Sequence, residues 1–256
     1  MTVHFEKDGP VAIVTLDRPE VANAIDRDTA DELASILEAF DADAELNVAV
    51  LTGANGKFCA GADLKAIATG KGNILTPEGR GPLGVTRMLL SKPVIAAVEG
   101  HAVAGGLELA LWCDLRVAAR DATFGVYCRR WGVPLCDGGT VRLPRLIGQS
   151  QALDMILTGR GVGGEEAARM GLVNRLCEPG EALDVARKLA HAIARLPQTC
   201  LRSDRASMYE QWETDLSAAL RRETEMGIAV VGSGETFAGI GRWSSGAWSF
   251  EEFAGV

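Results

Sequence analysis

The first fifty or so residues alternate short apolar runs with one helical pattern. Residues 3–6 and 11–16 are rich in β-favouring side chains, and Asp8-Gly9-Pro10 between them is typical of a turn. The apolar positions that follow recur with helical spacing: Ala30, Leu33, Ala34, Leu37 and Phe40. Residues 48–52 are then typical of a buried strand. This order predicts ββα units and an α/β fold.

The middle of the chain repeats the pattern around a long loop. Residues 94–98 and 115–118 are strand candidates, and 105–112 is a helix candidate that is apolar on nearly all sides. Between residues 70 and 84, glycine and proline are frequent enough to predict a loop. A loop of this length in a compact domain is usually functional or mobile.

From Arg142 onward the pattern is mostly helical, apart from a short apolar piece near residues 172–173. We expect residues 1–195 to form the core and 196–256 a helical region. That region carries many apolar side chains: Trp212, Leu216, Leu220, Met226, Ile228 and Val230. Because apolar surface on an appendage can pack against another subunit, the pattern favours an oligomer.

Composition is that of a globular protein, with 256 residues, 47% of them apolar and 23% charged. Residues 94–112 come closest to a membrane span, but Glu99, His101 and Glu108 interrupt them. The N-terminus lacks the pattern of a signal peptide, so we expect a cytoplasmic protein without a membrane segment.

Net charge and cysteine content limit the kinds of ligand that we expect the chain to bind. The net charge of −8 opposes general nucleic-acid binding, but it permits one anionic small molecule. Six cysteines form no C-x-x-C pair, and the chain has only three histidines. We therefore expect reduced thiols and no metal site.

Two glycine turns are the first candidates for chemistry. Residues 58–65 and 100–108 each run from a strand towards a helix start, with small residues around Ala62 and Gly105. Backbone N–H groups at a helix start are unpaired and carry the positive end of the helix dipole. Two such amides aimed at one point would form an oxyanion hole. Each turn alone also fits an ordinary strand-to-helix connection.

Taken in order, these motifs resemble the crotonase (enoyl-CoA hydratase/isomerase) superfamily. The resemblance begins with Phe-Cys-Ala-Gly-Ala-Asp-Leu-Lys at 58–65 and continues through Lys-Pro-Val-Ile-Ala-Ala-Val at 92–98 and Gly-Gly-Leu-Glu at 105–108. Shorter matches follow, such as Gly-Gly-Thr at 138–140 and Leu-Thr-Gly at 157–159. It covers most of residues 10–175.

The resemblance implies a spiral of ββα units followed by a helical region that forms a homotrimer or homohexamer. It implies that the substrate is an acyl-CoA thioester, so that CoA is part of the substrate and not a cofactor. It implies neither a metal nor a redox cofactor. The matching positions give Ala62 and Gly105 as the amides that bind the thioester oxygen. Ala62, Asp63, Leu64 and Lys65 would line the CoA path. Lys65 matches a phosphate-contacting lysine, although by itself it fits a solvated helix residue.

Glu108 follows the second glycine turn and matches the first catalytic glutamate of the family. A glutamate in the first helical turn also suits the dipole alone, but the apolar surroundings favour a functional acid or base. The family hydratases carry a second glutamate where this chain has Cys128. A thiol is a poor substitute for that carboxylate, and we interpret Cys128 as an inert small residue rather than a nucleophile.

Asp137 is a partial replacement for the missing carboxylate. It lies near the position of an active-site aspartate in dienoyl-CoA isomerases and some dehalogenating relatives. It equally fits a helix N-cap before Gly-Gly-Thr. Arg129 and Arg130 could contact Asp137 or an acidic acyl group.

We therefore predict an enoyl-CoA hydratase/isomerase-type enzyme in which Glu108 moves the proton. Two alternatives remain open. One is a double-bond isomerase or thioester hydrolase that uses Glu108 or Asp137. The other is a catalytically weak acyl-CoA binding protein.

Overall fold

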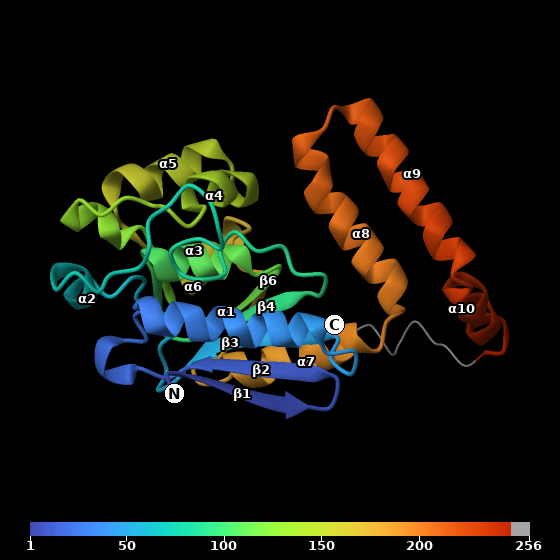
Figure 1. Ribbon diagram of the computed structural model, residues 1–256, viewed down its shortest axis with the longest axis horizontal. Coiled ribbons are helices and arrows are strands. Elements are labelled where there is room, and N and C mark those ends of the chain that lie inside the picture. The colour runs from blue at the N-terminus through green and yellow to red at the C-terminus, as the bar shows by residue number, and fades with distance from the viewer. Residues whose placement is uncertain (247–256) are drawn as a thin grey trace. The chain divides into compact units, whose positions relative to one another are not determined.

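The computed structural model describes residues 1–246 and divides the chain into two compact units, Met1–Ala190 and His191–Val256 (Figure 1). Residues 247–256 of the predicted helical region lie outside the described residues.

The first unit is built on a six-stranded sheet in the order β1-β2-β3-β4-β6-β9. Its strands are β1 (Val3–Asp8), β2 (Val11–Leu16), β3 (Val48–Gly53), β4 (Val94–Val98), β6 (Leu115–Ala119) and β9 (Arg175–Cys177). In this sheet β1 and β2 pair antiparallel, and the other neighbouring strands pair parallel. Every residue of β4 is buried, as expected for a parallel strand covered on both faces.

Helix α1 (Arg27–Ala42) lies along one face of this sheet (Figure 1). The carboxylate of Asp26 accepts a hydrogen bond from the Thr29 amide at 2.9 Å and caps the helix start. The predicted apolar stripe from Ala30 to Phe40 is buried, which confirms the helical interpretation of that pattern.

A second, three-stranded sheet has the order β5-β7-β8. It consists of β5 (His101–Val103), β7 (Thr123–Gly125) and β8 (Gly161–Gly163). The chain leaves β4 in the large sheet, enters β5 in the small sheet and continues into helix α3 (Gly105–Trp112). This segment is one of the predicted ββα units.

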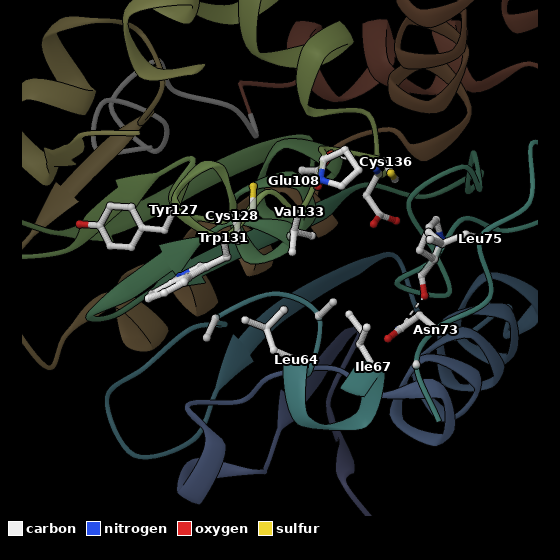
Figure 2. A pocket seen from close by; sticks show the side chains of 18 of the residues that line it. Leu64, Ile67, Asn73, Leu75, Glu108, Tyr127, Cys128, Trp131, Val133 and Cys136 are labelled. Atoms are coloured by element: carbon white, nitrogen blue, oxygen red, sulfur yellow. Dashed lines mark hydrogen bonds between the residues drawn. The ribbon is translucent and has the colours of Figure 1, made fainter. Parts of the chain in front are cut away.

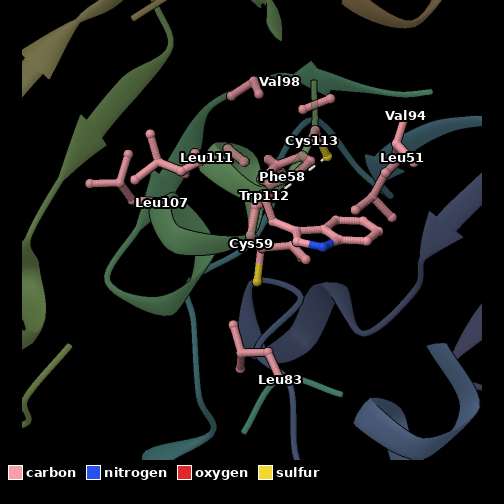
Figure 3. Close-up of a cluster of buried hydrophobic side chains, with 14 of the residues drawn as sticks. Leu51, Phe58, Cys59, Leu83, Val94, Val98, Leu107, Leu111, Trp112 and Cys113 are labelled. Atoms are coloured by element: carbon pink, nitrogen blue, oxygen red, sulfur yellow. Dashed lines mark hydrogen bonds between the residues drawn. The ribbon is translucent and has the colours of Figure 1, made fainter. Parts of the chain in front are cut away.

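Helix α3 is held in the core by side chains on several sides. Leu107, Leu111 and Trp112 pack in a buried cluster with Phe58 and Leu83 (Figure 3). The indole Nε1 of Trp112 donates to the Met88 carbonyl at 2.8 Å. Such packing fixes the helix, and with it the side chains at its first turn.

The rest of the first unit is helical between short strands. It contains η1 (Pro19–Val21), α2 (Leu64–Ala68), η2 (Tyr127–Trp131), α4 (Gly139–Ile147), α5 (Gln149–Thr158), α6 (Gly164–Arg169) and α7 (Ala182–Ala194), the last of which crosses into the second unit. The short apolar piece at Leu172 and Val173 lies between α6 and β9. Both amides close the end of α6 on the Ala167 carbonyl, and β9 begins at Arg175.

The second unit contains α8 (Gln198–Glu210), η3 (Gln211–Glu213), α9 (Leu216–Gly232) and α10 (Glu235–Ser244). Large apolar side chains are exposed along these helices: Trp212, Leu216, Leu220, Ile228, Phe237, Ile240 and Trp243. Within residues 1–246, we find no helix with the length and apolar character that a membrane crossing requires.

Candidate active site

Strand register brings the two glycine turns together. Cys59 pairs with Ala102 of β5 in a parallel bridge, and Ala62 and Gly105 each lie three residues further along. A Cβ built on Gly105 would lie 3.4 Å from the Ala62 nitrogen. The structure thus places the two predicted amides side by side at one end of the paired segments.

Neither amide has a hydrogen-bond acceptor within residues 1–246. Ala62 forms a parallel bridge with Ile25, and that bridge uses the Gly61 carbonyl and the Asp63 amide. The Ala62 N–H therefore points away from Ile25. Gly105 is the first residue of α3, where no intrahelical acceptor exists for its N–H.

The backbone around these amides has unusual torsions. Ala104, the residue before Gly105, has φ +54° and ψ −126°, which L-residues rarely adopt. Gly61 has φ +93°, and a Cβ there would lie 2.6 Å from the Gly105 nitrogen. Strain of this kind persists where the surroundings fix it, often at functional sites.

Glu108 is buried in the first turn of α3, with 3% of its surface exposed. The amides of Asp137 and Gly139 both donate to its Oε1 at 2.8 Å. A Cβ on Gly139 would lie 3.0 Å from that oxygen, so glycine permits this approach. Burial raises the pKa of Glu108 to about 7, and the nearby Asp137 charge contributes to the rise against the pull of the two amides.

Asp137 is buried and contacts the loop before β4. Its Oδ1 accepts hydrogen bonds from the Leu83 amide at 3.0 Å and from the Thr86 hydroxyl. Helix α4 begins after Gly138 without a side-chain cap. The N-cap interpretation of Asp137 was therefore wrong, because its carboxylate points to another segment. Burial raises the pKa of Asp137 above its ordinary value, although both hydrogen bonds oppose the rise.

Thr86 and Arg142 support Asp137, and neither has a signal in the sequence. The guanidinium of Arg142 donates to the carbonyls of Asp137 at 2.9 Å and Thr86 at 2.6 Å. The expected arginines lie elsewhere: Arg129 donates to the Ile156 carbonyl, and Arg130 donates to the Gly159 carbonyl and stacks on a tyrosine ring. Arg142 and Thr86 are 56 positions apart in the chain, so no local spacing in the sequence could indicate their contact.

The two glycine turns, Glu108 and Asp137 line a cavity of about 490 Å³. Figure 2 shows Glu108, Cys128 and Val133 along one wall and Leu64 and Ile67 of α2 along the opposite wall. Its lining includes Ala62, Gly105, Glu108 and Asp137, with apolar surface from Leu64, Ile67, Leu75, Tyr127, Trp131 and Val133. An apolar pocket with a few convergent polar groups is the usual form of a small-molecule site.

The amino-acid sequence matches the enoyl-CoA hydratase/isomerase family over residues 6–241. The chain belongs to this family. The family and the crotonase-like fold predicted from the sequence are both confirmed.

Characterised relatives are similar over most of their length. A short-chain-enoyl-CoA hydratase of Clostridium acetobutylicum is 38% identical over 230 residues, which is 87% of each chain. A carnitinyl-CoA dehydratase of Escherichia coli strain K12 is 42% identical over 194 residues, covering 75% of this chain and 74% of that one. The crystal structure of an enoyl-CoA hydratase from Mycobacterium marinum matches with a TM-score of 0.91 and 38% identity, covering 95% of this chain and 96% of that one.

The residues expected along a CoA path differ in their surroundings. Asp63 is buried, caps α2 through the Lys65 and Ala66 amides and pairs with Arg18 at 3.0 Å. Leu64 lines the cavity, whereas the Lys65 side chain is exposed on α2 outside the cavity lining.

Cys128 lies in the cavity wall. Burial raises the pKa of its thiol, and the Glu108 charge adds to the rise. The thiol is therefore neutral near pH 7 and a weak base. Within residues 1–246, no group of three His, Cys, Asp or Glu side chains is arranged to hold a metal.

Proposed function

We propose that the protein adds water across, or shifts, the double bond of an enoyl-CoA thioester. The proposal is carried by one observation: two unpaired amides and a buried glutamate line the same cavity. The family of the chain and the names of its relatives support the same class of substrate.

In the proposed reaction, the thioester oxygen accepts hydrogen bonds from the Ala62 and Gly105 amides. Negative charge develops on this oxygen when the thioester becomes an enolate. Donors fixed in advance stabilise that charge by about 3–4 kcal/mol each. The strained backbone at Ala104 would hold the Gly105 amide in place.

Glu108 is the proposed proton-transfer group. With a pKa of about 7 it holds and releases a proton near neutral pH, as general acid–base catalysis requires. In hydration it would give its proton to the carbon next to the thioester, and in dehydration it would take that proton back. Asp137 receives both of its hydrogen bonds on Oδ1, so Oδ2 is proposed to bind the reacting water and to accept the proton that the water loses when its oxygen bonds to the third carbon of the acyl group. Proton exchange with solvent then returns Glu108 and Asp137 to their starting protonation states.

A shift of the double bond without water is the second candidate, and Cys128 favours it. A neutral thiol in place of the second glutamate removes one base for activating water, whereas a double-bond shift needs only one proton carrier. Thioester hydrolysis and weak catalysis with retained binding are the remaining alternatives.

Mass analysis and proton NMR of the products from a panel of CoA esters together separate these reactions. Crotonyl-CoA that gains the mass of one water identifies a hydratase, and 3-enoyl-CoA that becomes 2-enoyl-CoA at unchanged mass, detected by NMR, identifies an isomerase. Release of free CoA identifies a hydrolase, and binding without product identifies a binding protein. If no ester in the panel binds or reacts, the proposed function is wrong.

The remaining expectations stay predictions. We propose that Lys65 contacts the CoA phosphates, that no separate cofactor takes part and that the protein acts in the cytoplasm. A homotrimer or homohexamer is supported by the exposed apolar side chains of the second unit, such as Leu216 and Trp243.

A further inference from the structure

An unused hydrogen-bond acceptor lies in the cavity wall. Asn73 belongs to the loop between α2 and β4, and its Nδ2 donates to the Pro82 carbonyl at 2.8 Å. Its Oδ1 is buried and has no hydrogen-bond partner within residues 1–246. If the oxygen and nitrogen of the Asn73 side chain exchanged places, Oδ1 would face the Pro82 carbonyl oxygen, and two acceptors would meet. The contact with Pro82 therefore identifies Oδ1 as the unused atom.

A buried acceptor without a partner is unfavourable. Leaving such a group unsatisfied costs more than a typical hydrogen bond contributes, and native proteins contain few examples. A ligand that donates a hydrogen bond to Asn73 Oδ1 would remove that cost. A ligand of the same shape without a donor would not.

Backbone contacts connect Asn73 to the catalytic carboxylates. The Pro82–Leu83 peptide accepts from Asn73 through its carbonyl and donates to Asp137 Oδ1 through its amide at 3.0 Å. The Asp137 amide in turn donates to Glu108. Asn73 therefore lies on the side of the cavity where the acyl group reacts.

Figure 2 agrees with this placement, because Asn73 and Leu75 lie towards the same end of the cavity as Cys136, and Trp131 lies towards the other. Asp137 Oδ2 is a second acceptor without a partner in residues 1–246. The acyl end thus offers two acceptors. Leu75, two residues further along the same loop, is 70% exposed and also lines the cavity.

We propose that Asn73 is a specificity-determining residue whose Oδ1 accepts a hydrogen bond from a hydroxyl group on the acyl chain. The preferred substrates are then acyl-CoA thioesters with a hydroxyl beyond the reacting carbons. This inference rests on the proposed function, because it assumes that an acyl-CoA thioester occupies the cavity.

The test compares saturated esters, which have no double bond to hydrate or shift, in matched pairs such as hexanoyl-CoA and 6-hydroxyhexanoyl-CoA. Calorimetry gives the dissociation constants for wild type, for Asn73→Leu and for the control Ile74→Ala, an exposed position on the same loop outside the cavity lining. Loop damage affects both members of a pair, so it cancels in their ratio. We expect wild type and Ile74→Ala to favour the hydroxylated ester by about tenfold, and Asn73→Leu to lose that preference.

Three results would overturn the inference. Equal binding of both esters to wild type leaves the proposed function intact but removes the hydroxyl preference. Equal weakening of both esters in Asn73→Leu assigns the acceptor to an amide of the CoA arm or to a bound water. Failure of every ester to bind wild type rejects the proposed function itself.

Discussion

At the scale of single residues, Glu108 combines deep burial with two backbone hydrogen bonds on one oxygen. Burial favours the neutral acid, and the amides of Asp137 and Gly139 favour the carboxylate. The result is a pKa of about 7, which populates both forms at neutral pH. The same raised pKa also makes the free energy of unfolding depend on pH.

As pH rises from about 4.5 to about 7, wild type should lose stability relative to Glu108→Gln. The folded-state pKa of about 7 exceeds the ordinary 4.5, so the folded protein binds this proton more tightly than the unfolded chain does. Its contribution is complete below about pH 4.5 and is lost as pH rises through 7. The difference between the two proteins should grow by roughly 3 kcal/mol.

Urea unfolding at several pH values measures this difference. The control Glu6→Gln, on the exposed strand β1, should follow wild type throughout. Parallel curves for wild type and Glu108→Gln would show that Glu108 does not hold a raised pKa.

Asp137→Asn should lower kcat/KM by about a hundredfold, as expected for a lost acid–base group. Removing the Asp137 charge should also lower the pKa of Glu108 and move the matching limb of the rate profile to lower pH. Initial rates against pH test both effects.

Thr86→Val is the matched control for Asp137, since it removes one hydrogen bond from the carboxylate and keeps the charge. Its effect should be smaller than that of Asp137→Asn. An unchanged rate and profile in Asp137→Asn would limit Asp137 to connecting two loops.

At the scale of elements, the active site depends on the turn that connects strand β5 to helix α3. Local patterns in the sequence were sufficient to predict most strands, α1, α3 and the two glycine turns. Spacing could not reveal that Cys59 pairs with Ala102, which is what aligns Ala62 with Gly105. Register between distant strands is set by tertiary packing.

The same limit explains what was missed at Asp137. Its neighbours in sequence are typical of a helix cap, but its partners Leu83 and Thr86 come from a loop about fifty residues away. Asn73 was likewise hidden in a segment that the sequence marks only as a loop. Resemblance to the family motifs indicated the positions of Glu108 and the two amides. The contacts of Asp137 and Asn73 could be seen only in the folded structure.

Substitutions at Ala104 test the turn between β5 and α3 directly. Its torsions are open to glycine and unfavourable for a β-branched side chain. Ala104→Gly should be about as stable as wild type, and Ala104→Val should lose about 2 kcal/mol or more. Denaturant midpoints compare the three proteins. Equal midpoints for the glycine and valine variants would show that the torsion is not maintained.

At the scale of the whole molecule, the exposed apolar side chains of α9 and α10 predict self-association. Light scattering should return three or six times the 27.1 kDa chain mass. Leu220→Glu with Ile228→Glu should reduce that mass, because charges would be placed on exposed apolar positions of α9. Glu223→Gln on the same helix is the control and should not. A wild-type mass of one chain at micromolar concentration would reject the prediction.

The most direct test of the central claim compares turnover and binding in Glu108→Gln. The account assigns proton transfer to Glu108 and thioester binding to the Ala62 and Gly105 amides, which this substitution leaves in place. The most active ester of the panel should be turned over at least about a thousandfold more slowly by the variant. Its dissociation constant, measured by calorimetry in the same preparation, should stay close to that of wild type. Turnover at the wild-type rate in Glu108→Gln would contradict the mechanism.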